Sequence, residues 1–154
     1  MRFALETLGV QTMDRELVSM SGRIGNMTEA MDDVFALLFR IERKQFDSQG
    51  GYGSGGWAAL APSTVARKRR LGLDPRILRE TGALFKSVTG KASTNVALPK
   101  KDGLVFGTTI EYGRFHQLGT SRMPARPVVE LPESDKREII KIVQRHIVEG
   151  RDGF

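Results

Sequence analysis

Few side chains in this sequence could act as a catalytic base, a nucleophile or a metal ligand. The 154 residues include no cysteine and two histidines, His116 and His146, which lie in different segments. Without cysteine, thiol catalysis and cysteine-ligated zinc sites are excluded. The adjacent carboxylates of Asp32 and Asp33 would point about 100° apart on a helix, which is a poor arrangement for an acid and base pair. We therefore expect no enzyme activity, no metal and no cofactor. His116 is expected to be hydrogen-bonded near a sheet, and His146 to lie on a helix surface.

A glycine-rich segment follows the longest apolar pattern of the chain, with five glycines among residues 50–56. Such a loop binds phosphate when Gly-Lys-Ser/Thr follows it, or when its glycines are spaced as in a dinucleotide turn, and neither pattern is present. We expect a mobile loop over residues 48–57. It ends at Trp57, the single tryptophan. This side chain either packs on its own subunit or anchors in a neighbouring one, because tryptophan is enriched among interface hot spots.

The positive charge of the chain is concentrated in one segment. The formal net charge is +6, from 24 basic and 18 acidic residues. Residues 64–91 carry eight basic and two acidic groups, so the rest of the chain sums to zero. The densest part of this segment is Arg67, Lys68, Arg69 and Arg70. Because four consecutive residues cover about 300° of a helix, they cannot all face one ligand. A solvated helix end and a contact surface for a polyanion or an acidic protein are both open interpretations.

Two amphipathic helices are expected to position these residues. The first covers residues 28–47, where Asn26 or Thr28 can cap the start. Apart from one adjacent pair, its apolar residues recur three to five positions apart: Met27, Met31, Val34, Phe35, Leu38, Ile41 and Phe46. The second starts at Pro132 and stops at Gly150. Its apolar stripe consists of Ile139, Ile140, Val143 and Ile147.

Between and before these helices the pattern predicts shorter elements. Helices are expected over residues 62–70, 77–81 and 111–118. Strands are expected over residues 84–89, 95–98 and 104–110, with an Asp-Gly hairpin turn in the connection 99–103. Residues 3–5 are a further candidate strand, and residues 13–20 have apolar side chains at helical spacing. The predicted fold class is α+β, in which a small antiparallel sheet of three to four strands packs with the two long helices.

The whole chain, residues 1–154, is expected to form a single soluble domain. Leu, Ile, Val and Phe are abundant enough for a hydrophobic core, and no window of 18 apolar residues indicates a membrane span. Charges at positions 2 and 6 leave no room for the apolar stretch of a secretion signal. Residues 1–25 and 150–154 are candidates for flexible arms that become ordered on assembly.

Several short motifs occur in a characteristic order in the middle of the chain. They are the helix ending near Phe46, the glycine-rich segment, residues 57–64, Lys68, residues 77–87, the strand ending at Gly107, Tyr112, residues 116–119 and residues 123–128. Over roughly residues 35–130 this order resembles the virion-morphogenesis proteins of tailed bacteriophages and prophages, also called tail-completion or head-to-tail joining proteins. The glycine-rich loop departs from the usual pattern in its length and in lacking a proline before Trp57.

The resemblance implies a non-enzymatic structural protein of the virion neck and tail, assembled in the host cytoplasm without a membrane. It implies a homo-oligomeric ring, expected to be a hexamer, that completes the tail and joins it to the DNA-filled head beside neighbouring neck and tail proteins. Candidate subunit or partner contacts are Trp57, Met123, Pro124, Arg126 and Pro127. Residues 123–128, stiffened by two prolines, either dock on a neighbour as an extended strand or form a connection within the chain.

Two other functions stay open at this point. The ring could cap the tail tube as a tail terminator. A nucleic-acid-binding protein would use residues 67–91, and in a neck ring Arg67, Lys68, Arg69 and Arg70 could face viral DNA in the channel or an acidic neighbour. Binding of this kind must weaken steeply with salt. Against it, Phe85 is the one aromatic residue of this segment, and no DNA-binding motif surrounds it.

Overall fold

The computed structural model describes residues 8–53 and 55–150, and this part of the chain forms six helices and two strands. In chain order they are α1 (Leu8–Gly25), α2 (Thr28–Asp47), α3 (Pro62–Arg70), α4 (Ala83–Val88), β1 (Asn95–Lys100), β2 (Gly103–Thr108), α5 (Gly113–Leu118) and α6 (Glu133–Val148). The α+β class is confirmed. The candidate strand at residues 3–5 lies outside the described residues.

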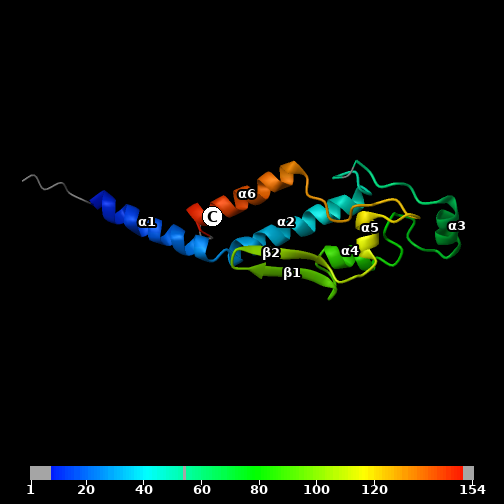
Figure 1. The fold of residues 1–154 in the computed structure, drawn as a ribbon, viewed down its shortest axis with the longest axis horizontal. Helices are drawn as coiled ribbons and strands as arrows, with labels where there is room; N and C mark the ends of the chain where they lie inside the picture. The colour runs from blue at the N-terminus through cyan, green and yellow to red at the C-terminus, as the bar shows by residue number, and fades with distance from the viewer. Residues whose placement is uncertain (1–7, 54, 151–154) are drawn as a thin grey trace, which may run out of the picture.

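α2 is the central element of an elongated molecule (Figure 1). α6 packs along one side of it, and α4 with the β1-β2 hairpin packs along the other. α1 extends from one end of the molecule and contacts the body through α6, whereas α3 and α5 lie toward the opposite end. The described chain therefore presents two separate ends, joined by α2.

Two hydrophobic clusters on α2 hold these layers together. The first lies against the hairpin and α6, and its buried residues are Met27, Ala30, Met31, Val34, Phe35, Leu37, Leu38 and Ile41. The second lies at the C-terminal end of α2, and its buried residues are Phe46, Trp57, Ile77, Leu84, Val88 and Val128. The apolar stripe predicted for residues 28–47 thus faces the core along its whole length.

The predicted bounds of α2 and α3 match the structure. The side-chain oxygen of Asn26 accepts hydrogen bonds from the backbone N–H of Thr28 at 3.2 Å and from its hydroxyl at 2.7 Å, and so satisfies one free donor at the start of α2. α3 has Pro62 in its first turn, where a missing N–H costs no helical bond. α5 ends, as expected, before Gly119, which has a φ of 74°.

The described residues form a two-stranded antiparallel sheet, so the expectation of three to four strands is wrong. The hairpin itself is confirmed, with Asn95 paired to Thr108 and Lys100 paired to Gly103. Pro99 lies inside β1, opposite Leu104, and not in the connection. A proline is tolerated there because each strand of a two-stranded sheet has a free edge, where no N–H donor is required.

The predicted strand over residues 84–89 is α4, a short helix. Gly82 precedes it with a φ of 75°, and its carbonyl accepts the backbone N–H of Lys86 at 2.9 Å. Leu84 and Val88 lie four residues apart and both enter the second cluster. The apolar residues of this short run fit both the two-residue period of a strand and the 3.6-residue period of a helix. The helix forms because it buries Leu84 and Val88 together in the second cluster.

Residues 77–81 form a turn, so the helix predicted there is also wrong. Leu78 has a φ of 59°, a left-handed conformation that ends any right-handed helix. The preceding N–H of Ile77 donates to the side chain of Gln49 at 3.1 Å, on the loop after α2. Distant polar contacts therefore hold this segment in place of helical hydrogen bonds.

α6 agrees with the expected last helix, with two corrections on its faces. Ile139, Ile142, Val143 and Ile147 pack against the first cluster, whereas Ile140 is exposed. His146 is buried, not on the surface as expected, and its Nε2 lies 3.3 Å from the backbone oxygen of Asn26. The reason is the position of the loop between α1 and α2, which covers this end of α6.

Candidate functional site

Trp57 packs inside its own chain. Its side chain is 7% exposed, and its ring meets Phe46 edge-on at a centroid distance of 5.2 Å. The indole Nε1 donates a hydrogen bond to the backbone oxygen of Pro127 at 2.8 Å. This packing fits the intrachain interpretation of the tryptophan, and its role as a subunit contact stays a prediction. Trp57 therefore joins the glycine-rich loop to residues 123–128.

Residues 123–128 are fastened to the same chain by Arg126. This buried side chain donates from Nε to the backbone oxygen of Ala58 at 2.8 Å and from an Nη to that of Ala59 at 3.0 Å. Its backbone N–H donates to the oxygen of His116 on α5 at 2.7 Å. Arg126 and Pro127 thus act within the chain, whereas Pro124 is exposed and Met123 half-buried.

Gln117 is a structural residue that the sequence pattern did not single out. Its side-chain oxygen accepts the N–H groups of Val128 and Val129 at 2.8 and 2.9 Å, and its amide nitrogen donates to the oxygen of Val129 at 2.9 Å. Its place in the sequence, two residues before the glycine that ends α5, gives only a weak indication that its side chain binds another segment. Together with Arg126, it holds the extended segment against α5.

A pocket of about 740 Å³ opens where these segments meet. Its apolar walls include Ala59, Leu60, Leu84, Met123 and Pro124. Its charged lining residues are three cations, Lys68, Arg122 and Arg126, and one carboxylate, Glu80. The lining therefore carries an excess of two positive charges. The pocket brings together four of the sequence-predicted contact residues, namely Lys68, Met123, Pro124 and Arg126.

The basic run on α3 is divided among three environments. Lys68 is 3% exposed, and its Nζ donates to the backbone oxygens of Asp74 and Arg76 at 3.0 and 2.8 Å. Arg67 forms an ion pair with Glu80. Arg69 and Arg70 are exposed. Lys68 therefore holds the turn after α3, and its contact with DNA or an acidic partner stays a prediction.

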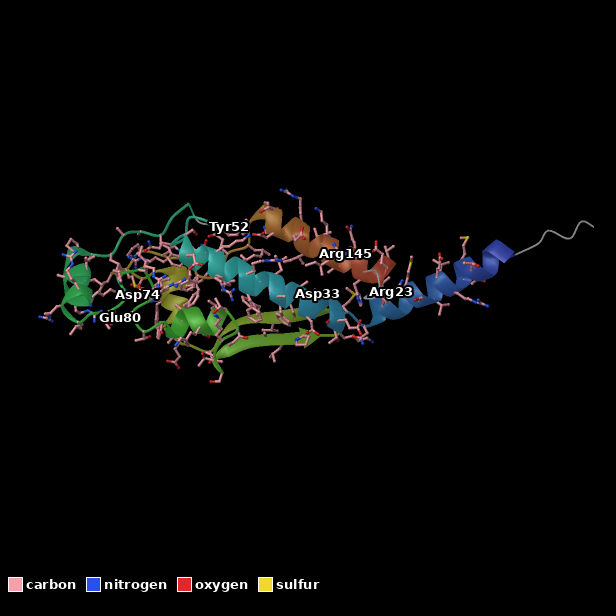
Figure 2. The ribbon with its side chains drawn as sticks, turned by 180° about the vertical axis from the view of Figure 1, so that it is seen from behind. Arg23, Asp33, Tyr52, Asp74, Glu80 and Arg145 are labelled. Atoms are coloured by element: carbon pink, nitrogen blue, oxygen red, sulfur yellow. The ribbon has the colours of Figure 1, made fainter. Side chains whose placement is uncertain are left out.

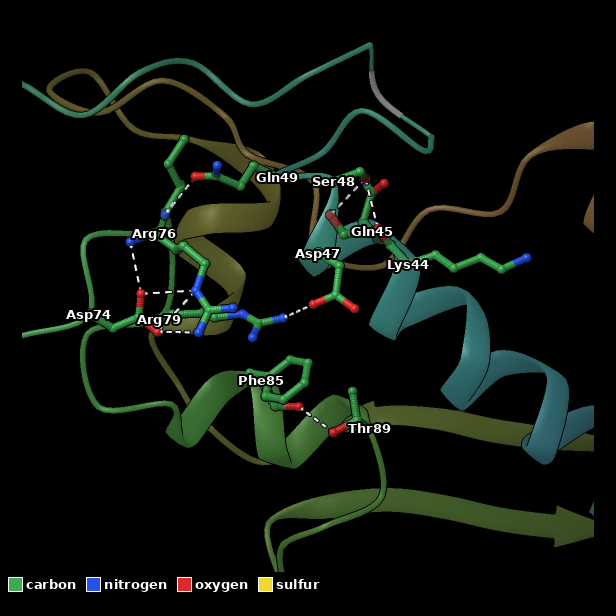
Figure 3. Close-up of polar contacts among 11 residues, drawn as sticks. Lys44, Gln45, Asp47, Ser48, Gln49, Asp74, Arg76, Arg79, Phe85 and Thr89 are labelled. Atoms are coloured by element: carbon green, nitrogen blue, oxygen red, sulfur yellow. Dashed lines mark hydrogen bonds and ion pairs between the residues drawn. The ribbon is translucent and has the colours of Figure 1, made fainter.

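Two further cations of residues 64–91 are also paired. Arg79, which is buried, donates to Asp47 at 2.6 Å and lies 3.8 Å from the ring centroid of Phe85. Figure 3 shows this guanidinium between the carboxylate and the ring. Arg76 pairs with Asp74 at 2.6 Å, which holds the pKa of that carboxyl at about 2. Several cations of residues 64–91 therefore stabilise the turns around α3 and α4.

His116 borders the pocket without the hydrogen bond expected for it. Its buried Nδ1 has no hydrogen-bond partner among the described residues. Burial, together with the nearby charge of Arg126, lowers the pKa of His116 below its usual value. Its ring packs edge-on against Tyr112 at 6.0 Å. In the part of the chain that the structure describes, no three His, Asp or Glu side chains gather as a metal site.

Glu42 is a buried acid that the sequence pattern gave no reason to expect. It lies on the core face of α2 at 1% exposure, and its Oε2 has no hydrogen-bond partner in the described chain. Burial raises the pKa of this carboxyl from 4.5 to about 9, so the side chain is protonated at pH 7.

The helix predicted around residues 13–20 is confirmed as part of α1, and its apolar side chains are uncovered. Met13, Leu17, Met20 and Ile24 recur at spacings of four, three and four, so they share one face. Met13, Leu17 and Ile24 are each more than half exposed. The helix is fixed to the body at its C-terminal end. There Arg23 donates to the backbone oxygens of Ile147 and Val148 at 2.7 and 2.9 Å. Figure 2 shows Arg23 where α1 meets the end of α6.

Comparison with known proteins gives a family match over most of the chain. Residues 7–148 match the model of the phage virion morphogenesis family. A segment of 45 residues is 47% identical to the Mu-like prophage FluMu G protein 1 of Haemophilus influenzae. That alignment covers 29% of this chain and 31% of the relative, so it spans less than a third of either. No solved structure shows significant similarity to the chain.

Proposed function

The chain belongs to the phage virion morphogenesis family, and from that premise we propose that it is a structural, non-enzymatic subunit of the virion neck. It assembles in the host cytoplasm into a homo-oligomeric ring, for which a hexamer is the expected size. The ring completes the tail and joins it to the DNA-filled head, in contact with neighbouring neck and tail proteins.

The uncovered apolar face of α1 is the observation that carries this proposal. Met13, Leu17 and Ile24 are 57–60% exposed on one face of a helix that extends from the body. A contiguous apolar surface of this kind is typical of a contact between proteins. A subunit that buries this surface in an assembly removes it from water, and each 100 Å² of apolar area so removed contributes about 2.5 kcal/mol before the entropic cost of association.

None of the described helices has the length and apolar character needed to cross a membrane. The family match and the similarity to a prophage protein both support a place in the virion. Within the virion, the tail-terminator role is the nearest alternative to head-to-tail joining. In that role the ring would cap the tail tube.

Imaging of particles made without this protein tests the proposal and separates the two roles. We expect filled heads and complete tails of normal length that fail to join. Tails of irregular, extended length would instead identify a tail terminator, because an uncapped tube continues to polymerise. Normal infectious particles would contradict both roles.

A contact with viral DNA in the channel is a second proposal, favoured by Arg69 and Arg70. Both side chains are exposed, and neither forms an ion pair within the described chain. In a ring around a DNA channel, two such cations on each subunit would give repeated positive charge. Phosphate contacts of this kind position DNA without reading its sequence.

A further inference from the structure

Two apolar surfaces lie at opposite ends of the molecule. One is the stripe on α1, and the other is the pocket of about 740 Å³ beside α3 and α5. Figure 2 shows this separation, with Arg23 at the junction of α1 and α6 and Glu80, a lining residue of the pocket, near the opposite end. The hydrogen bonds from Arg23 to the end of α6 fix the C-terminal end of α1 far from the pocket. A chain therefore cannot place its α1 in its own pocket.

The stripe on α1 has acidic edges. On a helical wheel, Asp14 lies about 90° to one side of the centre of the stripe and Glu16 about 70° to the other, whereas Arg15 lies on the opposite face. All three side chains are exposed. The surface presented by this helix is therefore an apolar ridge between two carboxylates.

The pocket has the complementary character. Its lining combines apolar side chains with three cations, Arg122, Arg126 and Lys68, against the one carboxylate of Glu80. Lys68 and Arg126 donate to backbone oxygens, and neither forms an ion pair with a carboxylate among the described residues. Glu80 is already paired with Arg67. The pocket is thus a partly apolar cavity with a net positive lining, within the size range of typical ligand sites.

We propose that α1 of one copy docks its apolar stripe into the pocket of the next copy, with Asp14 and Glu16 facing the positively charged lining. This is a helix-in-groove contact, and it joins two different surfaces of the same chain. Such a head-to-tail contact repeats around a closed ring when the rotation between subunits closes. The inference rests on the proposed ring function, for which it supplies the subunit contact.

The variant Leu17→Glu places a charge in the apolar stripe and so tests the α1 side of the contact. Leu17 is 57% exposed and glutamate is a good helix former, so the variant is expected to fold with unchanged circular dichroism. We expect it to be monomeric in light scattering at concentrations where the wild type is oligomeric. The matched control is Val18→Glu, which makes a similar apolar-to-acidic change at the next residue, 73% exposed and about 130° from the centre of the stripe. This control is expected to assemble as the wild type does.

Ala59→Glu tests the pocket side. Ala59 is an exposed residue of the pocket wall, and a glutamate there fills space and repels the acidic edges of α1. This variant is also expected to be monomeric. A mixture of Ala59→Glu and Leu17→Glu, however, contains one intact helix and one intact pocket. We expect the mixture to form a one-to-one dimer and nothing larger.

The outcomes separate this contact from the proposed function. If Leu17→Glu assembles like the wild type, or Val18→Glu disrupts assembly equally, the contact is wrong while the neck role stands. If Ala59→Glu assembles, or the mixture gives no dimer, α1 binds elsewhere, for example to a second α1, and the contact is again wrong. A wild type that is monomeric at every concentration would refute self-association altogether. Normal particles formed without the protein would refute the neck role and leave the contact standing.

Discussion

Glu42 shows how a single buried side chain gives this fold a pH dependence. Its folded pKa of about 9 lies above the ordinary value of 4.5, so between these values the folded state binds a proton that the unfolded state has released. The stabilising effect of that proton is complete below about pH 4.5 and is lost as the pH rises toward 9. At pH 7 the loss is already about 3 kcal/mol, since each pKa unit corresponds to about 1.4 kcal/mol.

Glu42→Gln should remove this dependence, because glutamine has the shape of the protonated acid and does not ionise. We expect the free energy of unfolding of the variant to exceed that of the wild type at pH 8 by about 2–4 kcal/mol more than at pH 5. Urea unfolding at the two pH values measures the difference. Glu138→Gln, at an exposed position of α6, is the matched control. Equal pH profiles for wild type and Glu42→Gln would contradict the assignment.

At the residue scale, side-chain identity alone revealed part of the site. Trp57 stood out because it is unique and follows a glycine-rich loop, and it does lie in the core. The structural roles of Gln117 and Lys68 gave little signal, because their partners are backbone groups that lie outside their own helices. A polar residue that serves the backbone of another segment has the same local pattern as a solvated one, so only the folded arrangement distinguishes them.

At the element scale, the loop after α2 depends on one of its glycines. Gly50 has a φ of 87°, and a Cβ built there would lie 2.4 Å from a ring carbon of Trp57 and 2.6 Å from its backbone nitrogen. Gly50→Ala is therefore expected to destabilise the fold by about 2–5 kcal/mol, combining left-handed backbone strain with overpacking. Gly55→Ala is the control: its φ is 71°, but its Cβ would meet nothing within 4 Å. We expect a cost of about 1–2 kcal/mol there. Thermal unfolding of both variants checks the ranking, and equal losses would contradict it.

α1 is held to the body mainly at its last turn. Arg23→Ala removes the two hydrogen bonds to the end of α6, so α1 should open more readily while α2 is unaffected. Hydrogen exchange of the α1 amides is expected to become about 5- to 150-fold faster, from a loss of about 1–3 kcal/mol. Arg15→Ala on the exposed face of the same helix is the control. Unchanged exchange in Arg23→Ala would show that other contacts anchor the helix. The interpretation of residues 1–25 as an arm stays a prediction, which this experiment addresses for α1.

Elements were predictable where a long apolar pattern allowed one periodicity, as in α2 and α6. They were mispredicted where the segment was short. In the segment that forms α4, the apolar residues fit both a strand period and a helix period. In residues 77–81, a hydrogen bond to Gln49 and the left-handed backbone of Leu78 fix a turn. In such segments tertiary contacts decide the conformation, and these contacts leave no trace in the local sequence.

At the scale of the whole molecule, half of the eight cations that the sequence places in residues 64–91 are used inside the fold. Arg67, Arg76 and Arg79 form ion pairs, and Lys68 is buried. The net charge of +6 is unchanged, but the part of α3 left free for a polyanion is the pair Arg69 and Arg70. The sequence could predict where the charge lies along the chain, and only the structure shows which of it is available.

Duplex DNA binding should therefore depend on Arg69 and Arg70 alone among the basic run of α3. The wild type is expected to bind duplex DNA with an affinity that falls as salt rises. Arg69→Ala/Arg70→Ala should reduce the slope of log affinity against log salt by about 1.8, because each phosphate contact contributes about 0.9. The control Arg137→Ala/Arg145→Ala removes two exposed cations of α6 and should leave the slope unchanged. An affinity that does not vary with salt would exclude phosphate contacts. An equal reduction of the slope in the control would place the DNA contact elsewhere. In either case the basic run of α3 would serve only to stabilise the fold.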